Sequence, residues 1–108
     1  MAERTVLRIS SEYLCYPTWL SSPGGGWTNP APAELGLPSD LAAELDAWSD
    51  DFDAIFPPDD PGSAAFASPA DQAAFYARGR GLAERVAALL GDRYRVTYRS
   101  RPDEVELS

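Results

Sequence analysis

The segment 39–56 constrains the fold more than any other part of the chain, because its apolar residues repeat with the period of an α-helix. They recur every three or four positions and form one stripe of Leu41, Leu45, Trp48, Phe52 and Ile55. Ser39 is expected to cap the first turn, and Asp40 complements its positive end. Pro57 and Pro58 end the pattern. The segment therefore predicts an amphipathic helix that buries one face.

A second helix is predicted from Pro69 onward. Ser68 is a suitable N-cap, Pro69 suits the first helical position, and Gly91 is a natural end. The apolar stripe of this helix comprises Phe75, Gly79, Leu82, Val86 and Leu89. Glycine inside a helix costs up to about 1 kcal/mol relative to alanine. The position of Gly79 on the stripe therefore predicts the close approach of another element.

Two segments read as strands. In residues 4–12, Leu7 and Ile9 share one face, while Val6, Arg8 and Ser10 share the other. Residues 93–99 alternate, with Tyr94, Val96 and Tyr98 on one face and Arg93, Arg95, Thr97 and Arg99 on the other. Each strand is therefore expected to cover a core on one side and leave arginines on the other.

These elements predict an α+β fold within a single domain, 1–108. Two helices would pack on one face of a two- or three-stranded sheet, in the order β-α-α-β with a possible final short strand. Residues 15–38, rich in Pro, Gly, Ser and Trp, read as a long loop. The tail, residues 101–108, is expected to be either a short strand built on Val105 and Leu107 or disordered.

The absence of histidine excludes several kinds of site. A Ser-His-Asp triad, a Cys-His pair and a zinc site of Cys and His cannot be built, and Cys15 is the only cysteine. All nine basic residues are arginine. We therefore expect no catalytic residue, metal or cofactor. No segment resembles a signal peptide or a membrane span, which predicts a cytoplasmic protein without membrane contact.

The net charge is −8 and is unevenly distributed. Residues 31–60 contain nine acids and no base. This imbalance disfavours direct nucleic-acid binding and favours a basic protein partner. The acids of residues 50–60 lack the spacing of a calcium-binding loop. Arg78, Arg80 and Arg85 could also pair with the acidic helix, within the chain or across a dimer.

The loop contains three consecutive glycines and two tryptophans. A phosphate-binding loop would lead directly into a helix and usually supply a lysine, so Gly24, Gly25 and Gly26 read as a flexible turn. Trp19 and Trp27 either cover the small core or anchor a protein interface. Tyr16 carries the same ambiguity.

The chain resembles small acidic actinobacterial proteins, some of which are immunity proteins that neutralise a cognate toxin. The resemblance spans Val6 to Tyr98, and its matching residues are Trp48, Asp51, Phe66, Ser68, Phe75, Gly79 and Leu82. Most of these residues read as structural. The resemblance therefore implies a fold more than an activity.

We interpret the chain as a non-enzymatic protein-binding module, most simply an immunity or inhibitor protein. The expected partner is a basic protein such as a toxin, and the expected contacts are Tyr16, Trp19, Trp27, Glu44, Asp46, Asp50, Asp51, Asp53, Asp59 and Asp60. One alternative is a homodimeric structural or accessory protein. A third is a small enzyme or ligand-binding protein that uses a carboxylate and arginine site.

Overall fold

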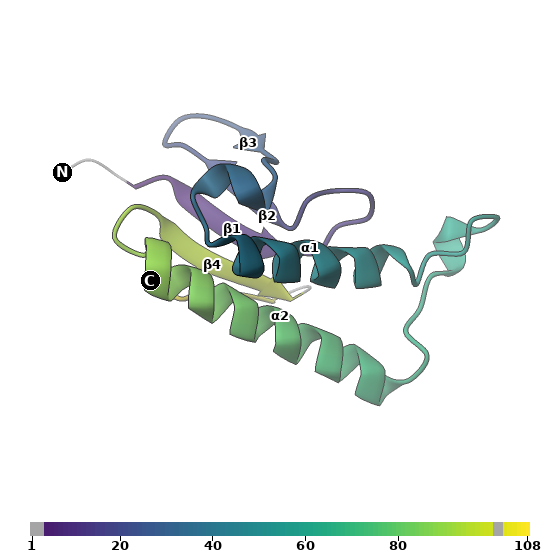
Figure 1. Cartoon of the computed structure of the whole chain (residues 1–108). Helices are drawn as coiled ribbons and strands as arrows, with labels where there is room; N and C mark the ends of the chain where they lie inside the picture. Colours follow the sequence, from purple (N-terminus) through teal and green to yellow (C-terminus); the bar gives the residue numbers. More distant parts are fainter. Residues whose placement is uncertain (1–3, 101–102) are drawn as a thin grey trace.

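The computed structural model describes residues 4–100 and 103–108 of the chain. Within these residues, two helices lie on the same face of a five-stranded sheet (Figure 1). The elements are β1 (Val6–Ser10), β2 (Thr18–Ser21), β3 (Trp27–Thr28), the 3-10 helix η1 (Pro32–Leu35), α1 (Ser39–Asp53), the 3-10 helix η2 (Pro61–Ser63), α2 (Pro69–Leu90), β4 (Arg95–Ser100) and β5 (Asp103–Glu106). The predicted α+β class with both helices on one face is therefore correct.

The sheet is mixed, with the order β3-β2-β1-β4-β5. β1 pairs antiparallel with β2 and parallel with β4, while β2–β3 and β4–β5 are antiparallel. The register places Leu7 between Leu20 and Val96. Because side chains alternate along a strand, these three residues share the face that the helices cover.

The prediction of a two- or three-stranded sheet in the order β-α-α-β is wrong, because the described chain runs β-β-β-α-α-β-β. Residues 15–38 contain β2 and β3 rather than loop alone. These strands are four and two residues long, too short to show a period in the sequence. The final short strand is confirmed as β5, and residues 101 and 102 of the predicted tail lie outside the described residues.

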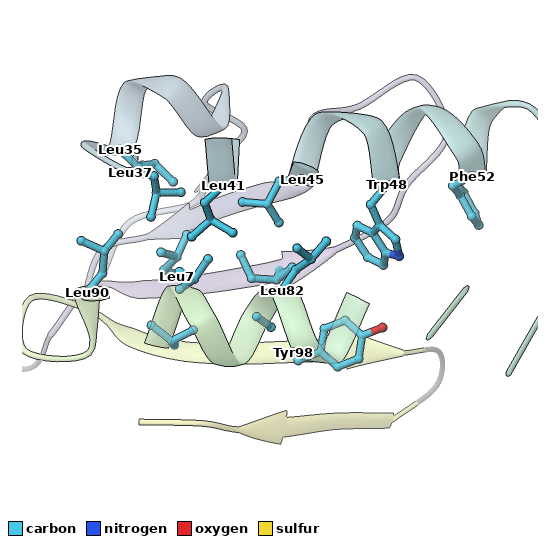
Figure 2. Packing of buried hydrophobic residues seen from close by; sticks show 14 of the residues in the cluster. Leu7, Leu35, Leu37, Leu41, Leu45, Trp48, Phe52, Leu82, Leu90 and Tyr98 are labelled. Carbon is cyan, nitrogen blue, oxygen red and sulfur yellow. The ribbon is translucent and has the colours of Figure 1, made fainter. Parts of the chain in front are cut away.

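The core lies between the helices and the sheet, and Figure 2 shows its leucines and Trp48 directed toward one another. Trp48 is fully buried, stacks on Phe75 at 4.8 Å between ring centroids, and donates from Nε1 to the Phe75 carbonyl at 2.9 Å. The predicted close approach at Gly79 is confirmed. A Cβ atom there would lie 2.3 Å from Trp48 Cζ2 and 2.6 Å from the Tyr98 hydroxyl.

The helix ends agree with the sequence in part. Ser68 Oγ accepts from the Asp71 amide at 3.1 Å, as an N-cap should. Ser39 is instead the first residue of α1, and no side chain caps that helix. Leu89 is 53% exposed and Leu90 is buried in its place, because the stripe steps by four residues from Val86. Neither described helix is long and apolar enough to cross a membrane.

Candidate functional site

Part of the predicted contact set gathers on one surface beside α1. Five residues form what we call the acidic surface: Leu14, Tyr16, Asp46, Asp50 and Asp53. They line a hollow of ≈ 660 Å³ together with Cys15, Asn29 and Ser49. Leu14 is 74% exposed and Tyr16 is 50% exposed. The acidic surface therefore combines carboxylates with two large apolar side chains that the core leaves uncovered.

The loop that follows β1 is fixed against α1 by hydrogen bonds. The Leu14 amide donates to Asp53 Oδ1 at 3.0 Å, and Ser49 Oγ donates to the Cys15 carbonyl at 3.0 Å. Tyr13 stacks on Phe56 with ring centroids 4.0 Å apart. Leu14 has a φ of 59°, a left-handed conformation that is strained for a leucine. The exposed leucine is thus held in an unfavourable conformation by the contacts around it.

Asn29 positions Tyr16 from the other side. Its Oδ1 accepts from the Tyr16 amide at 3.0 Å, and its Nδ2 donates to the carbonyls of Tyr16 and Thr18 at 2.9 and 2.8 Å. The side-chain amide therefore replaces backbone pairing just before β2 and at its first residue. Asn29 and Leu14 were not among the predicted contacts. The available sequence signal for Asn29 was an asparagine within a loop rich in Pro and Gly. The sequence carried no comparable signal for Leu14.

Two carboxylates of the acidic surface, Asp46 and Asp50, lie close enough to affect each other. Burial raises the pKa of Asp46, and the neighbouring carboxylate of Asp50 raises it further. Both effects disfavour the charged form of Asp46 in the isolated protein. A cation placed near Asp46 and Asp50 would relieve this repulsion.

The remaining predicted acids lie elsewhere. Glu44 pairs with Arg85, and Asp51 pairs with Arg78 at 2.6 Å, so both acids are matched by α2 within the chain. In the dimer alternative, the acidic helix would meet arginines of a second copy. Within the chain, Arg85 and Arg78 already pair with Glu44 and Asp51 of that helix. Asp59 and Asp60 are exposed in the loop between the helices, which protrudes from the rest of the fold (Figure 1).

The two tryptophans of the predicted contact set lie on the sheet face opposite the helices, which we call the open face. The register pairs Trp19 with Arg8, and Trp27 lies two strands away with the Arg8 guanidinium carbon 4.1 Å from its ring centroid. Trp27 is 44% exposed, while Trp19 is half-buried. Neither indole belongs to the core cluster, so the interpretation of these residues as a lid over that core is wrong.

The residues that could carry metal or nucleophilic chemistry are dispersed. Across 4–100 and 103–108, no three residues among Cys, Asp and Glu are placed to hold a metal ion. Burial raises the pKa of the Cys15 thiol, and Glu12 and Asp53 raise it further. A raised pKa lowers the thiolate fraction, so Cys15 is a poor nucleophile.

The comparisons with known proteins agree with the immunity type that the resemblance implied. A family model described as "Serratia CdiI immunity protein-like" matches residues 5–101, which is most of the chain. The match extends from the start of the sheet through β4 and so includes the acidic surface and both helices. A search of curated proteins found no match.

Proposed function

The chain belongs to the Serratia CdiI immunity protein-like family, and from that premise we propose that it binds and neutralises a cognate toxin without catalysing a reaction. An immunity protein acts by occupying its toxin. It therefore needs an exposed surface with anchors for the partner and a complementary charge.

The observation that carries the proposal is the acidic surface. Tyr16 and Leu14 supply large apolar contacts, and tyrosine is enriched at the energetic centres of interfaces. Asp46 and Asp50 lie beside them, and burial together with the Asp50 carboxylate raises the pKa of Asp46. A basic patch on the toxin that carries a lysine or arginine would fit this surface. Asp53 has a second role, because its carboxylate holds the Leu14 amide.

A paired comparison of neutral variants tests this proposal. Where the neighbouring gene encodes a toxin-like protein, that protein is the candidate toxin, and binding is measured by calorimetry with the purified pair. We expect the double variant Asp46→Asn and Asp50→Asn to weaken binding by about tenfold or more, because interfacial charge pairs are commonly worth at least 1.4 kcal/mol. The matched control, Asp59→Asn with Asp60→Asn, removes the same two charges from the protruding loop and should weaken binding by no more than about twofold.

A comparison of two adjacent residues on α1 tests which face of the helix binds the toxin. Asp50 belongs to the acidic surface, whereas Asp51 is paired with Arg78. Successive helical residues diverge by about 100°, so only Asp50→Asn should affect the complex. Equal losses for Asp50→Asn and Asp51→Asn would place the interface on another face. Absence of any complex, together with no protection of cells that express the toxin candidate, would contradict the immunity function itself.

A further inference from the structure

The open face of the sheet contains a second cavity, of ≈ 400 Å³, which adjoins the hollow of the acidic surface at Cys15. Both helices cover the other face of the sheet (Figure 1), so this cavity is not part of the core. Its volume lies in the range typical of sites for small molecules, and its lining is predominantly apolar and aromatic. We call it the aromatic cavity and define it by Arg8, Ser10, Glu12, Trp19, Trp27 and Arg99.

Two indoles form the walls of the aromatic cavity. Trp19 donates from Nε1 to the Ser10 carbonyl at 3.3 Å, which fixes its ring against β1. Trp27 is held by the cation–π contact with Arg8 yet keeps 44% of its surface exposed. Aromatic walls of this kind favour a flat ring, because offset and edge contacts between rings add to the gain from burial.

Ser10 is a buried polar residue in the lining of the cavity. This residue is only 2% exposed, and its Oγ has no hydrogen-bond partner within the described part of the chain. A buried hydroxyl without a partner costs about 1–3 kcal/mol. Ser10 points to the open face because it alternates with Ile9, which is in the core. Ser10 also lines the cavity, so a ligand that displaces the atoms now covering this hydroxyl would give it an acceptor.

The charges around the cavity favour a hydrogen-bond acceptor as that ligand atom. Arg99 is directly opposite Ser10 in the β1–β4 register. Arg8 is partly neutralised, because its Nε and Nη2 bind the carboxylate of Glu104 at 3.1 and 2.9 Å. Glu12 also lines the cavity and offsets the remaining positive charge. An oxygen acceptor near Ser10 and Arg99 suits this balance whether it carries a full or a partial negative charge.

We propose that the aromatic cavity binds a small aromatic molecule that carries a carboxylate or carbonyl oxygen. The ring packs on Trp19 and Trp27, and the oxygen accepts from Ser10 Oγ and from the Arg99 guanidinium. This activity is additional to toxin binding and uses a different face of the sheet.

The test uses three probes that share one ring: phenylacetate, phenylacetamide and toluene. Binding is followed by the indole Nε1–H signals of the three tryptophans in two-dimensional NMR spectra of the full chain. Phenylacetate and phenylacetamide should shift the Trp19 and Trp27 signals with a Kd of about 1 mM, as expected for such small ligands. Trp48 serves as the internal control, because it is fully buried and bonded to the Phe75 carbonyl.

Two variants identify the polar contacts. Ser10→Ala should weaken both oxygen-bearing probes by about tenfold and leave toluene unchanged. It removes an unpaired hydroxyl, so the fold should tolerate it. Arg99→Gln should weaken phenylacetate more than phenylacetamide, whereas Arg93→Gln, an exposed arginine outside the cavity, should alter neither.

Three outcomes would overturn the proposal. The first is that no probe shifts Trp19 or Trp27 at about 20 mM, well above the expected Kd. The second is that toluene binds as tightly as the oxygen-bearing probes, which would make the cavity a plain apolar patch. The third is unchanged binding in Ser10→Ala. None of these results would affect the toxin-binding experiment, because its variants lie on the acidic surface.

Discussion

Gly79 is the residue whose role is most sharply defined by its surroundings. Alanine is normally the better helix former by about 1 kcal/mol, yet a Cβ at this position would lie 2.3 Å from Trp48 Cζ2. The buried indole and the Tyr98 ring lie side by side and have little room to move. We expect Gly79→Ala to lower the free energy of unfolding by about 2 kcal/mol, in the range measured for overpacked cores.

The matched control lies two residues further along α2. Gly81 is exposed, and an added Cβ there meets nothing within 4 Å. Gly81→Ala should therefore raise the free energy of unfolding by up to about 1 kcal/mol. Urea denaturation of both variants provides the comparison. Equal effects of the two substitutions would show that helix propensity alone governs these positions.

Leu14 offers a second test at the level of one residue. Its φ of 59° suits glycine, so Leu14→Gly relieves strain of about 1 kcal/mol while increasing the freedom of the unfolded chain by a similar amount. The free energy of unfolding should consequently change by less than about 1 kcal/mol. Affinity for the toxin should fall by about tenfold, because the variant lacks an exposed apolar anchor.

The control for Leu14 is another exposed leucine far from the acidic surface. Leu89 on α2 is 53% exposed, and Leu89→Ala should leave toxin binding unchanged. Calorimetry and urea denaturation on the same samples separate binding from stability. A large loss of stability in Leu14→Gly without loss of affinity would make Leu14 a structural residue only.

At the level of elements, β5 is attached to the sheet partly through ionised carboxylates. Burial alone would raise the pKa of Glu104, but hydrogen bonds from Arg8 and Thr97 and the charges of Arg8 and Arg99 lower it overall. Thr97 Oγ1 donates to Glu104 at 2.8 Å. Arg95 likewise lowers the pKa of Glu106. A lowered folded-state pKa contributes stability above the unfolded value of 4.5 and loses it as the pH falls through the folded value.

We therefore expect the free energy of unfolding to be nearly constant from pH 7 to about 5 and to decline below the unfolded pKa. Glu104→Gln should cost about 1 kcal/mol at pH 7 and should flatten the decline at acid pH. Asp103→Asn, at the exposed start of the same strand, is the control and should keep the wild-type slope. Urea midpoints between pH 7 and 3 provide the measurement, and an unchanged slope in Glu104→Gln would contradict the assignment.

The elements also show why the sequence predicted some of this structure and not the rest. α1, α2 and β4 were predictable because each repeats its apolar residues over more than one period, and β1 because Leu7 and Ile9 flank a charged residue. β2 and β3 depend on partners distant in sequence. Leu20 acquires a place in the sheet through pairing with Leu7 and Thr28, and Asn29 supports the start of β2. Local propensity cannot reveal such contacts in strands this short.

The candidate site was predictable to a similar degree. The sequence indicated that Tyr16, Asp46, Asp50 and Asp53 could act together, and they do share one surface. It could not show that Glu44 would meet Arg85, because that depends on how α1 and α2 are rotated against each other. Nor could it place the tryptophans on the open face, since their orientation follows from strands that were not foreseen.

At the scale of the whole molecule, the protein is elongated, with dimensions of 47 × 26 × 25 Å, and carries a net charge of −8. Such a charge attracts a basic partner over distances set by the Debye length, about 10 Å at 0.1 M salt. We expect the association rate constant with the toxin to fall by roughly tenfold or more between 0.05 and 0.5 M salt, because screening removes the steering. The dissociation rate should change little, since short-range contacts, which we propose that Tyr16 and Leu14 make, govern the lifetime of a bound state.

Stopped-flow mixing with the purified toxin separates the two rates, and variants separate the contributions to steering. The variant with Asp59→Asn and Asp60→Asn should slow association slightly by lowering the net charge while leaving dissociation unchanged. The variant with Asp46→Asn and Asp50→Asn should slow association and also accelerate dissociation, because these charges lie beside the anchors. An association rate that is independent of salt would mean that the negative charge serves solubility, and that recognition rests on the shape of the acidic surface alone.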